Sequence, residues 1–170
     1  MIEYITAVDI NDRVISQVEK MEAHFKGVLH RAFSIFIFNS SKQLLLQKRN
    51  KDKYHSGGLW TNTCCGHPRY GETLTDAIHR RLGEEMGVSC ELKELFSFLY
   101  QVGFENKLIE NEYDHIFIGT YNGICCPNFN EVEEYKWVNV NEIKLEMAIS
   151  PQNYTYWFRC LFDKVIDETF

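Results

Sequence analysis

A run of apolar residues at 33–38, FSIFIF, limits what this chain can fold into more than any other segment. A strand that packs on one face alternates apolar and polar residues, whereas a continuous apolar run indicates a strand covered on both faces. The polar residues 39–41 then predict a turn, and residues 43–48, QLLLQK, predict a returning strand. We therefore expect other elements on both sides of a central sheet.

Further strand patterns occur at residues 4–20 around an Asn11-Asp12 turn, at 95–100, at 115–121 and at 135–140. Residues 73–86 predict a helix, because apolar side chains recur there at helical spacing, Thr73 can cap its start and Gly87 can end it. Ser150 and Pro151 predict the start of a C-terminal helix. This order of elements predicts an α/β (α+β) fold, with a mixed sheet sandwiched between helices.

Size and charge exclude several classes of protein. The 170 residues, of which 45% are hydrophobic, predict a single domain over residues 1–170. A formal net charge of -6 argues against a nucleic-acid partner, which requires a basic surface. The same charge still allows an anionic small molecule, because a few cations can reverse the sign of the field inside a cleft.

The N-terminal segment shows no signal-peptide pattern, and no apolar stretch is long enough to span a bilayer, so we expect no membrane partner. The six cysteines include the adjacent pairs Cys64-Cys65 and Cys125-Cys126. Neighbouring cysteines are poor disulfide partners, so we expect reduced thiols and a cytoplasmic location.

The predicted mid-chain helix carries acids at a defined spacing. From Gly66 the chain reads Gly66-x5-Glu72-x7-Arg80-Arg81-x2-Glu84-Glu85-x-Gly87. Arg81, Glu84 and Glu85 are expected to share the helix face opposite the apolar stripe. Adjacent carboxylates beside an arginine can hold a hard divalent ion and position a diphosphate on it. The alternative is a solvated face with ordinary ion pairs.

A second set of candidate ligands lies outside that helix. It comprises three histidines and two glutamates: His24, His30, His67, Glu110 and Glu112. Because Glu110 and Glu112 are two apart in a predicted strand, their side chains point to one face. Three imidazoles and two carboxylates suit a five- or six-coordinate ion such as manganese, magnesium or iron, with zinc as an alternative. Taken singly, each histidine is more often structural, and we interpret His55, His79 and His115 in that way.

The spacing at 66–88 resembles the Nudix box, except that Arg81 stands where Nudix hydrolases carry a glutamate. The chain as a whole resembles type I isopentenyl diphosphate isomerase over nearly its full length. The stretches that carry this likeness are VEKMEAH at 18–24, LHRAFSIFIFN at 29–39, LLLQKR at 44–49, WTNTCCGHP at 60–68 and IENE at 109–112. The resemblance implies a Nudix fold and an enzyme that interconverts isopentenyl and dimethylallyl diphosphate.

The resemblance also implies a role for individual residues. His24, His30, His67, Glu110 and Glu112 match the ligands of one divalent ion, Mn²⁺ or Mg²⁺, with Zn²⁺ or Fe²⁺ as alternatives. Glu85 matches a residue that helps to hold Mg²⁺ with the substrate diphosphate. Cys65 and Glu112 match the catalytic pair, and Tyr100 matches a tyrosine that assists the glutamate. The residues that match basic positions around the diphosphate are Lys20, Arg49, Lys53 and Arg81.

Moving a proton across an unactivated alkene creates a tertiary carbocation, so such a site needs an acid, a base and exclusion of water. An indole face can stabilise the cation, and Trp157 is the candidate. Trp157 also lies on the apolar stripe of the C-terminal helix, which makes a core position an equal alternative.

Three other hypotheses compete with the isomerase. A Nudix-type nucleoside diphosphate hydrolase would release phosphate products, although Arg81 speaks against it. A non-catalytic metal-binding module would leave the acid–base pair unexplained. A cysteine hydrolase built on Cys65 and His67 would need a histidine that is occupied by metal. The expected partner is a small diphosphate, and the expected assembly is a monomer or a weak homodimer.

Overall fold

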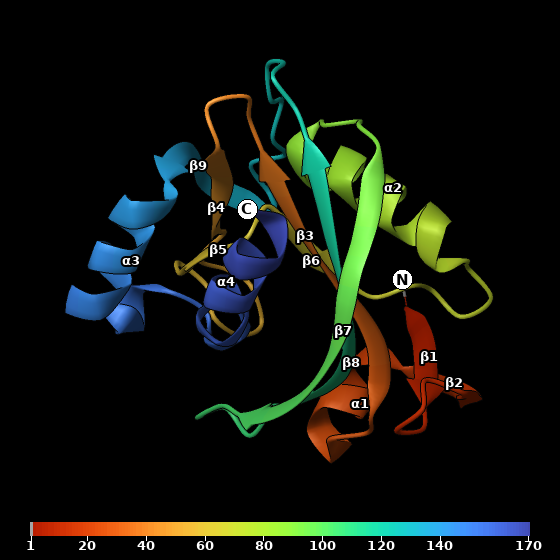
Figure 1. Cartoon of the computed structure of the whole chain (residues 1–170). Helices are drawn as coiled ribbons and strands as arrows, with labels where there is room; N and C mark the ends of the chain where they lie inside the picture. Colours follow the sequence, from red (N-terminus) through yellow and green to blue (C-terminus); the bar gives the residue numbers. More distant parts are fainter. Residues whose placement is uncertain (1) are drawn as a thin grey trace.

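The computed structural model describes residues 2–170 and contains a strongly curled mixed sheet with helices on both sides (Figure 1). The strands are β1 (Tyr4–Val8), β2 (Val14–Glu19), β3 (His30–Phe38), β4 (Gln43–Arg49), β5 (Trp60–Thr61), β6 (Cys64–Gly66), β7 (Leu92–Gly103), β8 (Ile109–Thr120) and β9 (Val132–Asn139). The helices are α1 (Lys20–Lys26), α2 (Leu74–Met86), α3 (Val140–Ile149) and α4 (Tyr156–Thr169), with a 3₁₀ turn at Pro151–Asn153. The predicted α+β class with a mixed sheet between helices is confirmed.

Strand β3 is the centre of the sheet. It pairs in parallel with β8 along its whole length and antiparallel with the short β6, while β1 and β4 pair with its two ends. The register sets His30 of β3 beside Glu112 of β8, and Ser34 of β3 beside Cys65 of β6. The pairing therefore brings three separate chain segments to the same region of the sheet.

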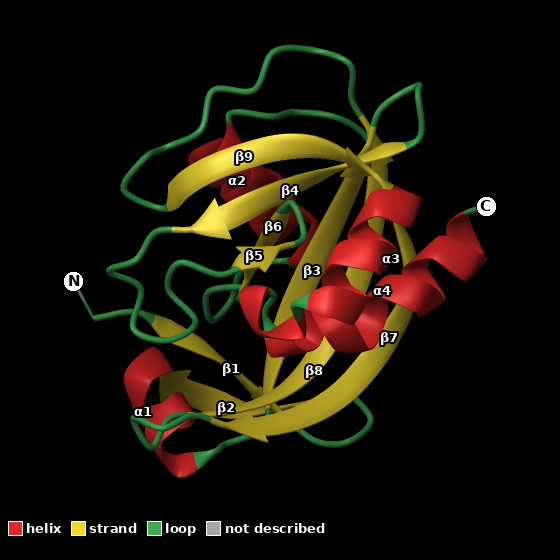
Figure 2. Cartoon of the chain, turned by 90° about the vertical axis from the view of Figure 1, so that its left-hand side faces the viewer, coloured by secondary structure: helices red, strands yellow, loops and turns green. Residues whose placement is uncertain are grey.

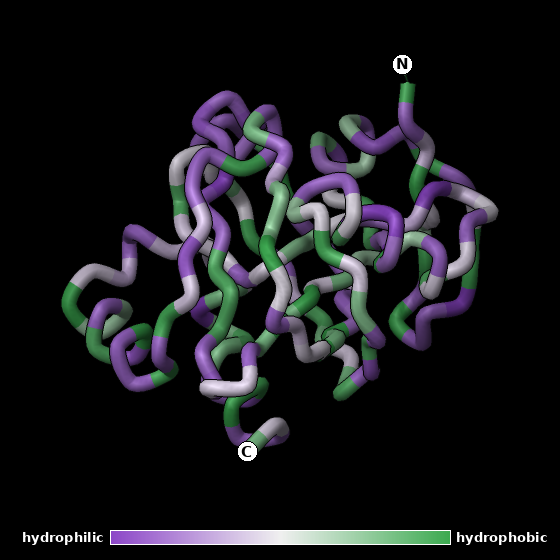
Figure 3. Tube along the Cα trace, turned by 90° about the horizontal axis from the view of Figure 1, so that it is seen from above, coloured by the Kyte–Doolittle hydropathy of each residue, from purple (hydrophilic) through white to green (hydrophobic). Residues whose placement is uncertain are grey.

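The apolar run on β3 is buried on both faces, as its sequence predicts. Phe33, Ile35 and Ile37 pack in a core under α2, and the alternate residues Phe36 and Phe38 pack in a core under α4. Figure 2 shows α3 and α4 in front of the sheet and α2 behind it. Apolar stretches run through the inside of the trace, and polar segments form much of the outer loops (Figure 3).

Helix α2 has the predicted bounds and caps. The Thr73 side chain accepts a hydrogen bond from the Asp76 backbone N–H, and Gly87 ends the helix with φ +63°. A side chain at Gly87 would also meet the backbone of Cys126 at 2.6 Å, so both conformation and space require glycine there. The confirmed helix fixes the positions of the charged residues of the box.

The C-terminal prediction is wrong at its start. Ser150 and Pro151 open only a 3₁₀ turn, and α4 begins at Tyr156 with Thr155 as its cap residue. Helix α1 was not predicted either. It begins where the Glu19 side chain accepts hydrogen bonds from the backbone N–H groups of Met21 and Glu22, and a glutamate is not a preferred cap.

Over residues 2–170, no helix has both the length and the apolar character needed to cross a membrane.

Candidate active site

One cleft collects most of the residues proposed from the sequence. Its lining includes eleven of them: Lys20, Arg49, Lys53, Cys65, His67, Arg81, Glu85, Tyr100, Glu110, Glu112 and Trp157. His24 and His30 lie directly behind this lining, in contact with His67. The sequence analysis did not single out Glu3, Ser34, Tyr54 or Glu131, and it interpreted His55 as structural, yet all five line the same cleft.

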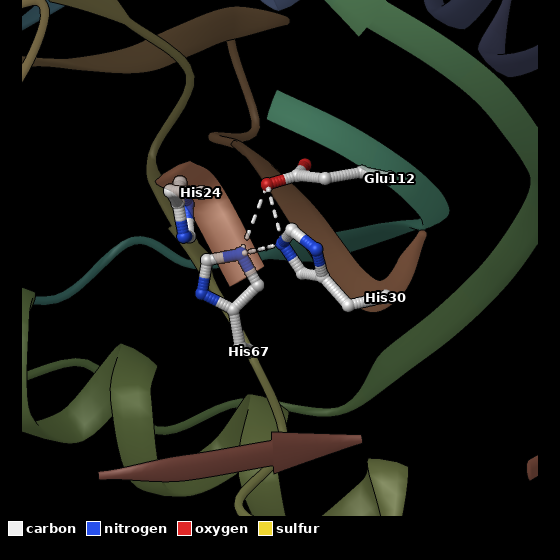
Figure 4. A group of neighbouring side chains, drawn as sticks. All are labelled: His24, His30, His67 and Glu112. Atoms are coloured by element: carbon white, nitrogen blue, oxygen red, sulfur yellow. Dashed lines mark hydrogen bonds and ion pairs between the residues drawn. The ribbon is translucent and has the colours of Figure 1, made fainter. Parts of the chain in front are cut away.

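Three histidines and a glutamate meet at one end of the cleft (Figure 4). His24 comes from α1, His30 from the start of β3, and His67 from the loop after β6. The His30 Nε2 and His67 Nε2 atoms are 3.2 Å apart, and His67 Nε2 lies 2.9 Å from Glu112 Oε1. One ligand atom from each of the four residues lies within 4.8 Å of the others, which is close enough to surround one ion.

Hydrogen bonds fix two of these imidazoles in the form that binds metal. His24 Nδ1 lies 2.7 Å from the Lys20 carbonyl oxygen, and His30 Nδ1 lies 2.7 Å from the Val28 carbonyl oxygen. Because a carbonyl oxygen only accepts, both Nδ1 atoms carry the proton, and the Nε2 lone pairs face the cluster. His24 Nε2 is buried without a hydrogen-bond partner. A divalent cation would satisfy it, so the donor set fits a metal.

Burial keeps two imidazoles neutral. It lowers the pKa of His24 to about 4 and that of His67 to about 3. Burial alone would raise the pKa of Glu112, but its interactions with His30 and His67 outweigh burial and hold that pKa well below its usual range. At neutral pH His24 and His67 therefore offer lone pairs rather than imidazolium protons, and Glu112 offers a carboxylate charge.

Strand β8 carries a row of buried acids on one face. Glu110 and Glu112 are both buried, and Tyr100 on the neighbouring β7 places its hydroxyl 2.9 Å from Glu110 Oε2 and 2.7 Å from Glu112 Oε2. Burial, and then repulsion from Glu112, raises the pKa of Glu110 well above its usual value. Glu110 does not belong to the four-residue group above; it forms a second group with His24 and His55.

Cys65 on β6 opens into the cleft, and its thiol is held by an amide. Cys65 Sγ donates to Asn62 Oδ1 at 3.1 Å, and the Asn62 side chain is itself fixed by donation to the Ile35 and Cys64 carbonyl oxygens. Burial raises the pKa of Cys65 to about 12, so the group is a protonated thiol at neutral pH. The adjacent Cys64 points into the core under α2 instead.

The box acids and their arginines form the other end of the cleft. Arg81 contacts Glu84 Oε2 at 2.8 Å and pairs with Glu85. Glu85 is 5% exposed and accepts from Gln47 Nε2 at 2.8 Å, whereas Glu84 is exposed. Both acids contact Arg81, as their spacing predicts, but Glu85 is buried with the apolar stripe rather than opposite it, and only Glu85 lines the cleft.

The basic residues of the cleft differ in how they are neutralised. Glu131 pairs with both Lys53 and Arg81, and Lys20 Nζ lies 3.1 Å from Glu3 Oε2. Within residues 2–170, no carboxylate lies within ion-pair distance of Arg49, whose guanidinium carbon is 5.3 Å from the Trp157 ring centre. Trp157 is 3% exposed, so it belongs to the core under α4 and lines the cleft as well.

Comparison with known proteins identifies the family of this chain. The NUDIX domain model matches residues 28–158. An isopentenyl-diphosphate Delta-isomerase of Burkholderia multivorans is 51% identical over 164 residues, covering 96% of this chain and 93% of that protein. Isopentenyl-diphosphate Delta-isomerase 2 of Photorhabdus laumondii is 52% identical, covering 94% of this chain and 90% of that protein.

The chain belongs to the isopentenyl-diphosphate Delta-isomerase family of NUDIX-domain proteins.

Solved structures show how far this isomerase shares its scaffold with other proteins. The MutT protein of Methanosarcina mazei has a TM-score of 0.68 at 18% identity, covering 82% of this chain and 94% of its own. DR0079 of Deinococcus radiodurans has a TM-score of 0.72 at the same identity, covering 86% and 90%. At this identity the likeness concerns the fold alone.

Proposed function

We propose that this chain interconverts isopentenyl diphosphate and dimethylallyl diphosphate by adding a proton at one end of the allylic unit and removing one at the other. The observation that carries the proposal is the placement of Cys65 and Glu112 in one cleft, beside a histidine cluster and a set of cations. The names of relatives about half identical over almost the full chain agree with it. Hydrolysis of a diphosphate would give the thiol of Cys65 no role in this cleft.

Divalent metal belongs to the chemistry of this family, and the residues of the cleft fit two positions. We assign one ion, Mn²⁺ or Mg²⁺, to His24, His30, His67, Glu110 and Glu112. We assign a second, Mg²⁺, to Glu85 together with the substrate diphosphate. When bound, the ions supply positive charge that orients Glu112 and neutralises the diphosphate.

The cations then hold the diphosphate. Arg49 lacks a carboxylate partner, so it is available to an anion without breaking an ion pair. Lys53 and Arg81 share Glu131, and Lys20 pairs with Glu3. These three become available to phosphate oxygens when the substrate competes with the two acids. Bidentate contacts from the arginines suit phosphate geometry.

Cys65 and Glu112 exchange the two protons. The thiol of Cys65 carries a proton at neutral pH, because burial raises its pKa to about 12, and it can deliver that proton to the alkene. Glu112 accepts or returns the other proton, and Tyr100, 2.7 Å from Glu112 Oε2, can relay it. The Trp157 ring, packed against the cleft, is placed to stabilise the carbocation by about 2 kcal/mol when water is excluded.

The direct test incubates purified protein with isopentenyl diphosphate and Mg²⁺ and follows both the isomer and free phosphate. We expect dimethylallyl diphosphate to form with no phosphate release. Phosphate release from isopentenyl diphosphate or from nucleoside diphosphates, without isomerisation, would favour the hydrolase alternative. We further propose a monomer or weak homodimer that acts on a free small molecule, without a nucleic-acid or membrane partner; sedimentation of the active protein tests the assembly.

A further inference from the structure

His55 is a buried histidine that the proposed mechanism does not use. It lies in the loop between β4 and β5, and its side chain is 2% exposed. The Phe104 ring stacks on the imidazole at 4.6 Å with an angle of 8° between the planes, and Trp157 contacts it edge-on at 6.0 Å. These neighbours hold the ring in one orientation against the histidine end of the cleft.

The Nε2 atom of this ring has no hydrogen-bond partner although a carboxylate is next to it. His55 Nε2 lies 3.0 Å from Glu110 Oε1, yet the two atoms are not aligned for a hydrogen bond. His24 Nε2 is also buried without a partner. Atoms of His24, His55 and Glu110 lie within 4.8 Å of one another. A cation bound among these three residues would satisfy both buried nitrogens.

The contact distances in the cleft match those between neighbouring ligands of one ion. At bond lengths of about 2.1 Å, adjacent ligands of an octahedral ion are about 3.0 Å apart. The His55–Glu110 contact is 3.0 Å, the His67–Glu112 contact is 2.9 Å and the two nitrogens of His30 and His67 are 3.2 Å apart. An ion bound by Glu110 through Oε1 would therefore lie within reach of His55.

We propose that His55 is a further ligand of the divalent ion in the cleft, bound through Nε2. The ion is then held by four imidazoles and two carboxylates, because the two groups of candidate ligands share His24. This inference rests on the proposed function for the other five ligands. Binding draws the two groups together around the ion.

A sixth protein ligand has a consequence for the reaction. Catalytic metal sites that activate water keep one coordination position open, whereas closed sites do not. With His55 bound, the protein side chains fill an octahedral ion and leave no position for a hydrolytic water. An ion without an open coordination position would orient Glu112 and would bring no water to a carbocation. This arrangement suits an isomerase better than a hydrolase.

Cobalt(II) substitution tests this assignment without relying on turnover. Six-coordinate cobalt(II) absorbs visible light weakly, and five-coordinate cobalt(II) absorbs several times more strongly. His55→Phe removes the nitrogen and keeps a ring to stack on Phe104. His115→Phe is the matched control, since His115 lies outside the cleft between Asp12 and Glu94. Thermal melting of each variant checks that it folds, and His55→Gln provides a second variant if the phenylalanine is not accommodated.

We expect His55→Phe to bind cobalt(II) about tenfold or more weakly than the unmodified chain and to show the stronger absorption of a lower coordination number. His115→Phe should match the unmodified chain in both measurements. A folded His55→Phe with unchanged affinity and spectrum would overturn the inference. If His55→Phe is unchanged while His67→Ala loses the ion in the same experiment, only the inference about His55 is overturned and the proposed function still stands.

Discussion

The two ends of the cleft handle charge in opposite ways. At the histidine end, which comprises His24, His30, His67, Glu110 and Glu112, the imidazoles of His24 and His67 are neutral and His24 Nε2 lacks a partner. At the arginine end, which comprises Lys53, Arg81, Glu85 and Glu131, every cation already contacts a carboxylate. The histidine end therefore has lone pairs and a carboxylate but no cation, whereas the cations of the arginine end are already neutralised by Glu85 and Glu131.

This difference separates a permanent ion from one that arrives with substrate. A cation at the histidine end gains lone pairs and a carboxylate without breaking an ion pair, so we expect tight binding there. At the arginine end, Glu85 is occupied by Arg81 and Gln47. A metal can use Glu85 only when the diphosphate supplies further oxygen ligands and competes for the arginine, as is usual for Mg²⁺.

The largest effect is expected from His67→Ala. We expect metal content to fall from about one ion per chain to nearly none after desalting, and the isomerisation rate to fall by about 10³-fold or more, because a ligand and the orientation of Glu112 are lost together. Elemental analysis and a rate assay measure the two effects. His115→Ala, outside the cleft, should change neither. Unchanged metal content in His67→Ala would show that the tightly bound ion is not held at the histidine end.

Glu85→Gln should separate the two ends. It keeps the size of the side chain and removes its charge, so we expect the rate at fixed Mg²⁺ to fall by roughly 10²-fold, with partial recovery at higher Mg²⁺. The tightly bound ion should remain. Glu84→Gln is the matched control one residue away, since Glu84 is exposed, and it should retain nearly full activity. Loss of the tight ion in Glu85→Gln would show that the ends are not separate.

The affinity of the histidine end for metal should depend on pH mainly through one ligand, Glu110. Protons compete with an ion only below the pKa of a ligand, and burial places those of His24 and His67 at about 4 and about 3, below the usual value of about 6.5. Of His24, His67 and Glu110, only Glu110, whose pKa burial raises, should release a proton. From pH 7.5 to about 5.5, the dissociation constant should rise by at most about tenfold per pH unit. A steeper loss below about pH 6.5 would mean that these imidazoles titrate normally.

Local sequence signals were sufficient for much of the fold. The two-sided apolar run of β3 predicted layers on both faces of the sheet, and the Thr73 and Gly87 caps predicted both ends of α2. The start of α4 could not be predicted from its cap signals. Ser150-Pro151 has the chemistry of a helix start. Tyr154, however, is buried in the core under α4 with an extended backbone, so the helix begins only at Tyr156.

The candidate site could be predicted where it depends on the repeat of a regular element or on the spacing of a motif. Glu110 and Glu112 share a face because strands repeat every two residues. His55 was interpreted as structural because a single histidine, taken alone, is more often structural than a metal ligand. Its burial depends on Phe104 and Trp157, which come from distant parts of the chain, and no local pattern contains that information. A histidine two residues from Lys53, which was predicted to line the cleft, is the signal that a search could use.

The central claim is that Cys65 and Glu112 exchange protons with the two ends of the allylic unit. The most direct measurement is isomerisation of isopentenyl diphosphate in deuterated water, with deuterium located in the product by NMR. The account predicts deuterium in the dimethylallyl product of the unmodified chain and of Cys64→Ala, whose altered thiol lies in the core under α2. It predicts a loss of several orders of magnitude in rate for Cys65→Ala and for Glu112→Gln. An active preparation whose product contains no deuterium, or full activity in Cys65→Ala, would contradict it.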